Sequence, residues 1–250
     1  LRIEGTNCED ESALAFSSLG CDVEKIHLKQ LLGDVDKSKQ RNIMDYYTLY
    51  FPGGYSSADY VLAGAIIASR IKSCLKSQFD EYINEWMTVL GVCNGFQILV
   101  ELGALPGQDS GISTAPEAVL HTNDSSRFEA RHVHLRVESS NQSFFTKNYK
   151  TNQVLSIPNA HAEGKLMVEP EKFKELDDNN QIAFRYCSPE GDLNPGYPWN
   201  PNGVAHDIAG ITNPKGNVLG MMPHPERATC KITKLTDGEN LFKSIYEFLS

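Results

Sequence analysis

Apolar and polar positions follow two different periods along this chain, and segments of the two kinds alternate. Short apolar or alternating runs predict strands at residues 1–3, 21–26, 46–51, 87–92, 131–137, 181–186, 207–212 and 218–222. Apolar residues three or four positions apart predict helices at residues 8–19, 58–75, 96–102 and 240–249. Alternating strands and helices are typical of an α/β fold, here a three-layer, mostly parallel open sheet flanked by helices.

The segments between these elements indicate loops, a helix cap and the number of domains. Residues 106–127 and 188–203 are rich in Gly, Pro and small polar residues, so both are predicted to be loops. Asn7 is expected to cap the first helix, with Glu9, Asp10 and Glu11 in its positive first turn. No stretch has the composition of a linker, so residues 1–250 are predicted to form a single domain.

Composition excludes several classes of protein to which this chain could otherwise belong. Of 250 residues 40% are hydrophobic and 22% charged, which is enough to bury a core and excludes wholesale disorder. The net charge of −9 argues against binding to nucleic acid or an anionic membrane. The longest apolar run, residues 61–68, is far below the ~20 residues of a membrane span. The N-terminal residues have no signal-peptide core. The six cysteines include no Cys-x-x-Cys pair, which indicates reduced thiols in a cytoplasmic protein.

The strongest chemical signal is a cysteine between two glycines at the end of a predicted strand. Gly91, Cys93 and Gly95 form a Gly-x-Cys-x-Gly turn into the next helix, as in a nucleophile elbow. The positive end of that helix would favour the Cys93 thiolate, and the Asn94 N–H would point at an oxyanion. A buried structural cysteine between two packing glycines is the alternative reading.

A thiolate nucleophile needs a base, and a candidate lies 131 residues further along the chain. His224 follows the strand predicted at residues 218–222, and Glu226 comes two residues later, where it can orient the imidazole. Strand ends at one edge of a parallel sheet can bring such groups together. Taken alone, the pair also fits a solvated loop histidine beside a surface glutamate.

Two further segments are candidates for substrate binding. Gly53 and Gly54 follow the strand at residues 46–51, and consecutive glycines can turn a backbone N–H toward an oxyanion. His161 and Glu163, flanked by small residues, fit a loop beside a pocket. No histidine spacing suggests zinc, and no phosphate-binding glycine motif is present, so neither metal nor nucleotide is expected in this chain.

Taken together, the elbow, the Pro-Gly-Gly loop and the His-Pro-Glu element resemble class I glutamine amidotransferase domains, which have a flavodoxin-like fold. In motif detail the chain is similar to the glutaminase subunits of purine biosynthesis. The resemblance implies hydrolysis of L-glutamine by Cys93, His224 and Glu226 through a glutamyl thioester. It implies oxyanion donors at Gly54 and Asn94, and glutamine binding by Gln97 and residues 161–164.

The resemblance also implies partners. Ammonia would pass to a separate synthetase subunit that uses ATP and magnesium, with a small bridging subunit in the same complex. The chain departs from the family pattern at Ala58 and Ala162, where the family has glycine. Two alternatives remain open at this point: a Cys-His-Glu amidotransferase or hydrolase serving another acceptor, and a non-catalytic binding module on the same fold.

Overall fold

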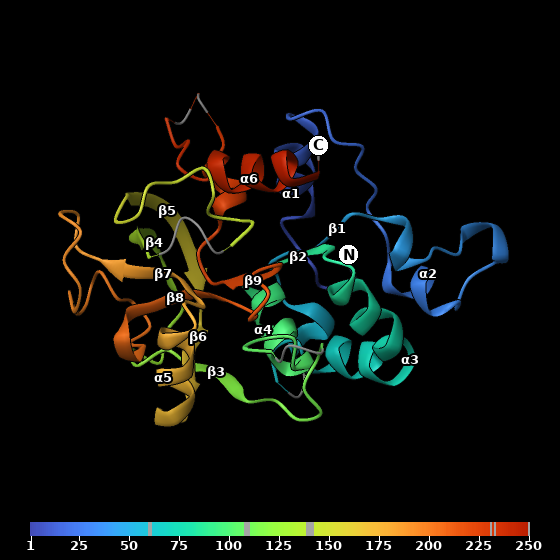
Figure 1. The fold of residues 1–250 in the computed structure, drawn as a ribbon, viewed down its shortest axis with the longest axis horizontal. Coiled ribbons are helices and arrows are strands. Elements are labelled where there is room, and N and C mark those ends of the chain that lie inside the picture. The colour runs from blue at the N-terminus through green and yellow to red at the C-terminus, as the bar shows by residue number, and fades with distance from the viewer. Residues whose placement is uncertain (60–61, 108–110, 139–142, 231, 233, 250) are drawn as a thin grey trace.

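The computed structural model describes every residue except 60–61, 108–110, 139–142, 231, 233 and 250. Its centre is a seven-stranded sheet of order β1-β2-β9-β8-β7-β4-β5 (Figure 1). The strands are, in that order, Thr48–Phe51, Thr88–Val92, Val218–Met221, Ile208–Thr212, Ile182–Cys187, Glu129–Val137 and Val154–His161. A two-stranded sheet pairs β3 (Ala118–Thr122) with β6 (Glu163–Val168).

The expected sheet is present, but its strand directions are mixed rather than mostly parallel. Only β1–β2 and β2–β9 pair in parallel, and the other four neighbouring pairs are antiparallel. The connections explain this correction, because parallel neighbours need a crossover, usually a helix. β8 and β9 are joined by a tight turn, in which the Gly216 N–H donates to the Asn213 carbonyl. Such a turn permits only antiparallel pairing.

Helices cover both faces of the parallel end of the sheet (Figure 1). The α-helices of the described residues are α1 (Glu9–Ser17), α2 (Leu28–Leu32), α3 (Ala65–Asn84), α4 (Asn94–Leu102), α5 (Pro170–Asp178) and α6 (Glu239–Leu249). α5 lies away from the parallel end, where its Asp177 pairs with Arg185 of β7. Successive residues of β1 point to opposite faces: the Tyr50 ring contacts Phe16 of α1, and the Phe51 ring contacts Phe79 of α3. The predicted three layers are therefore present at this end. Within the described part of the chain, none of the helices combines the length and the hydrophobicity of a membrane span.

Some elements differ from the sequence expectation. β3 lies inside the segment predicted as a loop, while β5, β6 and α5 were not predicted at all. Residues 21–26 form no strand, and only an isolated bridge joins Arg2 to His27. The N-cap of α1 is Cys8 in the left-handed region, and Asn7 instead accepts a hydrogen bond from the Cys8 N–H.

Candidate active site

Cys93 occupies a strained turn between β2 and α4. Its φ of 53° and ψ of −110° lie outside the regions that most residues adopt, a strain of about 1–3 kcal/mol that functional sites often carry. The glycines around it are required by space. A Cβ at Gly91 would lie 2.6 Å from the Gly95 carbonyl oxygen, and a Cβ at Gly95 would lie 1.9 Å from that of Phe51. The turn thus has the close-packed geometry that the sequence predicts for a nucleophile elbow.

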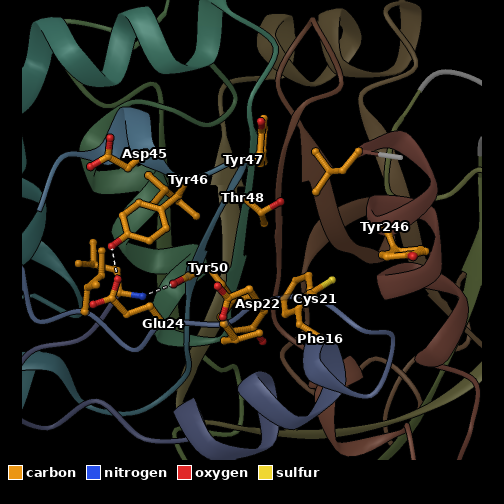
Figure 2. A pocket seen from close by; sticks show the side chains of 15 residues that line it. Phe16, Cys21, Asp22, Glu24, Asp45, Tyr46, Tyr47, Thr48, Tyr50 and Tyr246 are labelled. Carbon is orange, nitrogen blue, oxygen red and sulfur yellow. Dashed lines mark hydrogen bonds between the residues drawn. The ribbon is translucent and has the colours of Figure 1, made fainter.

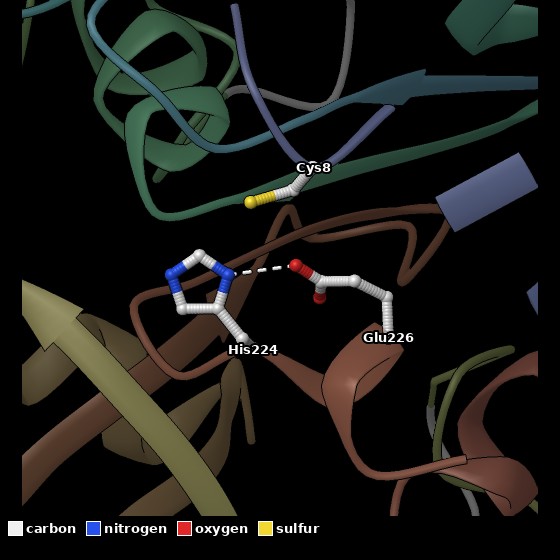
Figure 3. Close-up of side chains that lie close together, drawn as sticks. All are labelled: Cys8, His224 and Glu226. Carbon is white, nitrogen blue, oxygen red and sulfur yellow. Dashed lines mark hydrogen bonds and ion pairs between the residues drawn. The ribbon is translucent and has the colours of Figure 1, made fainter. Parts of the chain in front are cut away.

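His224 and Glu226 form a buried hydrogen-bonded pair at the end of β9 (Figure 3). His224 Nδ1 lies 2.7 Å from Glu226 Oε1, and each residue is 3% exposed. The His224 N–H donates to the Pro158 carbonyl of β5 at 2.7 Å, which fixes the loop that carries the ring. Since Glu226 holds Nδ1, the Nε2 edge is left for other contacts, and within the described part of the chain it has no hydrogen-bond partner.

The charge state of His224 is set by opposing effects. Burial alone would lower its pKa, but the Glu226 carboxylate and the neighbouring Cys8 and Cys93 sulfurs outweigh burial, so the pKa stands well above 6.5. A ring that is readily protonated can pair with a thiolate at Cys93 and can also deliver a proton. The pair is therefore equipped for acid–base chemistry beside a cysteine.

Gly53 is the point at which the separate chain segments meet. A Cβ built on Gly53 would lie 2.8 Å from His224 Cε1, 3.3 Å from Cys93 Cβ and 3.6 Å from Cys8 Sγ. The structure thus brings the predicted loop against both the cysteine and the histidine. Gly54, at φ 134°, is held against residues 5–7, because the Asn7 N–H donates to the Gly53 carbonyl at 2.8 Å.

Cys8 is a site residue to which no sequence motif assigns a chemical role. Cys8, His224 and Glu226 offer three ligand atoms within 4.8 Å of one another (Figure 3). However, the Arg227 guanidinium donates to Cys8 Sγ at 3.0 Å, so a metal ion there would meet a positive charge. We therefore assign no metal to this cluster. No local motif marks Cys8, because its position depends on the bridge between Thr6 and Gly54.

A cavity of about 260 Å³ opens onto Cys93 and His224. Gly54, Gln97, His161 and Glu163 also line it, together with Asn7, Cys8, Tyr55, Ala63, Phe128, Ala160, Ala162 and Arg227. Gly53, Asn94 and Glu226 are not in the lining. The Asn94 side-chain amide donates to Gln97 Oε1 at 2.9 Å, and Gln97 Nε2 donates to the Glu163 carbonyl at 2.6 Å. Six of the nine predicted residues thus line one cavity, and the other three lie directly behind residues that line it.

The two alanines that replace family glycines behave differently. Ala58 has a φ of 57°, in the left-handed region that favours glycine, so this departure costs local backbone strain. Ala162 has no such conformation. The backbone next to His161 therefore does not need the glycine that the family pattern has there.

A larger cavity, of about 470 Å³, lies at the edge strand β1 (Figure 2). Phe16, Tyr46, Tyr50 and Tyr246 are among its lining, and the Tyr46 hydroxyl donates to Glu24 at 2.6 Å. None of Cys93, His224 and Glu226 lines it. We nevertheless place the candidate site at the smaller cavity, because Cys93 and His224 line that cavity and not the larger one.

Comparison with known proteins shows the family to which the chain belongs. The family model described as the CobB/CobQ-like glutamine amidotransferase domain matches residues 1–246. The chain belongs to this glutamine amidotransferase family. The structural similarity to PurLQS is consistent with the flavodoxin-like α/β fold that the family resemblance implies, with a mixed sheet in this chain.

Three relatives are informative. The phosphoribosylformylglycinamidine synthase subunit PurQ of Archaeoglobus fulgidus is 47% identical, with all of this chain and 95% of the relative covered. The protein of the same name from Picrophilus torridus is 41% identical, over 91% of this chain and 85% of its own. A solved structure, PurLQS from Thermotoga maritima, matches with a TM-score of 0.75 at 28% identity, over 100% of this amidotransferase and 96% of that chain.

Proposed function

We propose that this chain is the glutaminase subunit of a phosphoribosylformylglycinamidine synthase in purine biosynthesis. It would hydrolyse L-glutamine and deliver the ammonia to a synthetase subunit. One observation carries the proposal: Cys93 on its strained elbow shares a cavity with His224, whose ring is oriented by Glu226. The names of the two curated relatives supply the synthase and the subunit.

In the proposed reaction, the Cys93 thiolate attacks the side-chain carbonyl carbon of glutamine. The Gly54 and Asn94 N–H groups stabilise the resulting oxyanion, a contribution of about 3 kcal/mol per donor. His224 gives its proton to the amide nitrogen, the C–N bond breaks, and ammonia leaves a glutamyl thioester. His224 then takes a proton from water, whose oxygen attacks the thioester carbon to release glutamate and the thiolate. Glu226 keeps the ring in place throughout.

Glutamine recognition is assigned to the walls of the cavity. Gln97, His161 and Glu163 line it on the side of β5 and β6, and Gln97 is itself anchored to the Glu163 carbonyl. Gly53 allows the close approach of the loop to Cys93 and His224. These roles agree with the chemistry of the residues and are part of the proposal.

The partners are proposed as follows. A separate synthetase subunit binds ATP and magnesium and consumes the ammonia, and a small bridging subunit joins the complex. The similarity to PurLQS of Thermotoga maritima supports an assembly of this kind. We further propose that the chain is a single cytoplasmic domain, with no nucleic acid or membrane as partner and no cofactor of its own.

The test uses the complex of this chain with its synthetase. Cys93→Ala should abolish formation of the amidine product from glutamine and leave its formation from added ammonium chloride within about twofold of wild type. Loss of both activities in a folded complex would contradict the assignment of Cys93 to ammonia production. Ammonia release from glutamine without any product from formylglycinamide ribonucleotide would identify the alternative, an amidotransferase serving another acceptor.

A further inference from the structure

The amide of Asn123, just after β3, has all its hydrogen-bonding groups committed. Its Nδ2 donates to the Arg127 carbonyl at 3.0 Å and to the His161 carbonyl at 2.9 Å. Its Oδ1 lies 3.1 Å from His161 Nδ1. Because both amide hydrogens point to carbonyl oxygens, the amide cannot be turned round without placing its oxygen against them. The atom that faces the histidine ring is therefore an acceptor.

An acceptor at Asn123 fixes the tautomer of His161. Nδ1 must carry the hydrogen, which leaves a lone pair on Nε2. Burial, and to a smaller extent the charge of His224, lowers the pKa of His161 to about 3, so the ring is neutral at physiological pH. His161 Nε2 is buried and has no hydrogen-bond partner within the described residues. An unsatisfied buried acceptor of this kind is costly unless a ligand supplies a donor.

The His161 ring stands at the reacting end of the cavity. It shares the lining with Cys93 and His224, and the preceding residue, Ala160, offers its carbonyl to the Cys93 thiol at 3.5 Å. Gly164 makes room for the ring, since a Cβ there would lie 2.4–2.8 Å from three ring atoms. The lone pair is thus held in one place by Asn123 and by close packing.

We propose that His161 Nε2 accepts a hydrogen bond from the side-chain amide N–H of glutamine, with Asn123 as its positioning residue, and that this bond selects glutamine over glutamate. The inference rests on the proposed glutaminase function. Glutamate has a carboxylate oxygen where glutamine has the amide nitrogen, so it offers no hydrogen to the lone pair and is repelled by it. The same contrast promotes release of glutamate after each turnover.

The kinetic test compares His161→Phe with wild type in the complex with the synthetase. Losing an acceptor that only glutamine satisfies should raise KM for glutamine about 10- to 100-fold. Inhibition by glutamate should stay the same or strengthen, so the ratio of glutamate Ki to glutamine KM falls at least tenfold. His132→Phe is the matched control, because His132 is exposed on β4 and does not line the cavity. It should leave the ratio unchanged.

Two kinetic outcomes would overturn the inference. Equal weakening of glutamine and glutamate would show that His161 contacts the α-amino or α-carboxylate group that the two share. An unchanged ratio with normal turnover would show that Nε2 contacts neither. Absence of any glutamine-dependent activity in the wild-type complex would instead refute the proposed function.

A second measurement tests the tautomer without relying on activity. Two-bond ¹H–¹⁵N spectra of the ¹⁵N-labelled chain, with His161 assigned by its loss in His161→Phe, should show hydrogen on Nδ1 and none on Nε2. Asn123→Ala should shift the ring toward a mixture of tautomers and lower the Ki/KM ratio, whereas a purely structural role would leave the ratio fixed. Hydrogen on Nε2 in the wild-type spectrum would overturn the proposal.

Discussion

Replacing Gly53 with alanine should lower the glutamine-dependent kcat/KM of the complex while leaving the fold intact. The new methyl would lie 2.8 Å from His224 Cε1 and 3.3 Å from Cys93 Cβ. Ordinary carbon–carbon contacts are about 3.5–4.0 Å, so the His224 ring must retreat by roughly 0.7 Å or more. The φ of Gly53 is not in the left-handed region, so alanine brings no backbone strain of its own.

The size of the effect follows from how tightly His224 is held. The ring is tied to Glu226 through Nδ1, and the backbone N–H of His224 is tied to Pro158, so a retreat of the ring strains the Nδ1 hydrogen bond. A misplacement of about 1 Å can cost about 10²-fold in rate. We therefore expect glutamine-dependent kcat/KM to fall about 30- to 100-fold, with activity from added ammonia unchanged.

The assay is steady-state product formation by the complex with glutamine or ammonium chloride, together with thermal unfolding of each variant. Gly20→Ala is the control: Gly20 has φ 90° and open space around its Cβ position, so alanine there brings backbone strain only. It should lower Tm without changing kcat/KM. A glutamine-dependent kcat/KM of Gly53→Ala within threefold of wild type would refute the reasoning.

Four other predictions follow from the structure. Glu226→Gln should slow glutamine hydrolysis less than His224→Ala. The pKa of His224 is raised in the folded protein, so protonated His224 stabilises the fold fully below pH 6.5, and this contribution is lost as pH rises through the folded-state pKa. The difference in unfolding free energy between wild type and Glu226→Gln, measured by urea titration, should therefore shrink from pH 6 to pH 9. The isolated chain should release ammonia from glutamine slowly, and the rate should rise when synthetase is titrated in. A lone chain that already releases ammonia at the rate of the complex would contradict this prediction. Asn217→Ala should destabilise the fold by about 2–4 kcal/mol in denaturant melts, because its buried amide donates to the Ile83 and Met87 carbonyls; a loss below 1 kcal/mol would contradict this.

The placement of Cys93, His224 and Glu226 was predictable because the constraints on these residues are local. Gly91 and Gly95 are needed by the elbow itself, and His224 and Glu226 are only two residues apart, so spacing alone carries the information. Cys8 was not predictable in the same way. The Cys8 thiol lies near His224 because an isolated β-bridge joins Thr6 to Gly54, and these two residues are almost 50 positions apart. No local sequence pattern encodes such a bridge.

The fold was predictable where each strand has a regular hydrophobic pattern. β5 was missed because it contains Pro158 and Asn159, which are poor strand formers in general. As an edge strand, β5 tolerates a proline, and the Pro158 carbonyl still binds the His224 N–H. The parallel expectation failed because strand direction depends on the connections, and the alternation of elements does not specify them.

The place of β9 in the sheet has a consequence for synthesis of the protein. This strand, near the end of the chain, lies between β2 and β8, and it brings His224 to a cysteine made 131 residues earlier. At about 5–20 residues per second, a ribosome needs roughly 7 to 26 s to cover that distance. A nascent chain therefore carries Cys93 for that time without His224, its proposed base, and we expect unfinished copies not to hydrolyse glutamine.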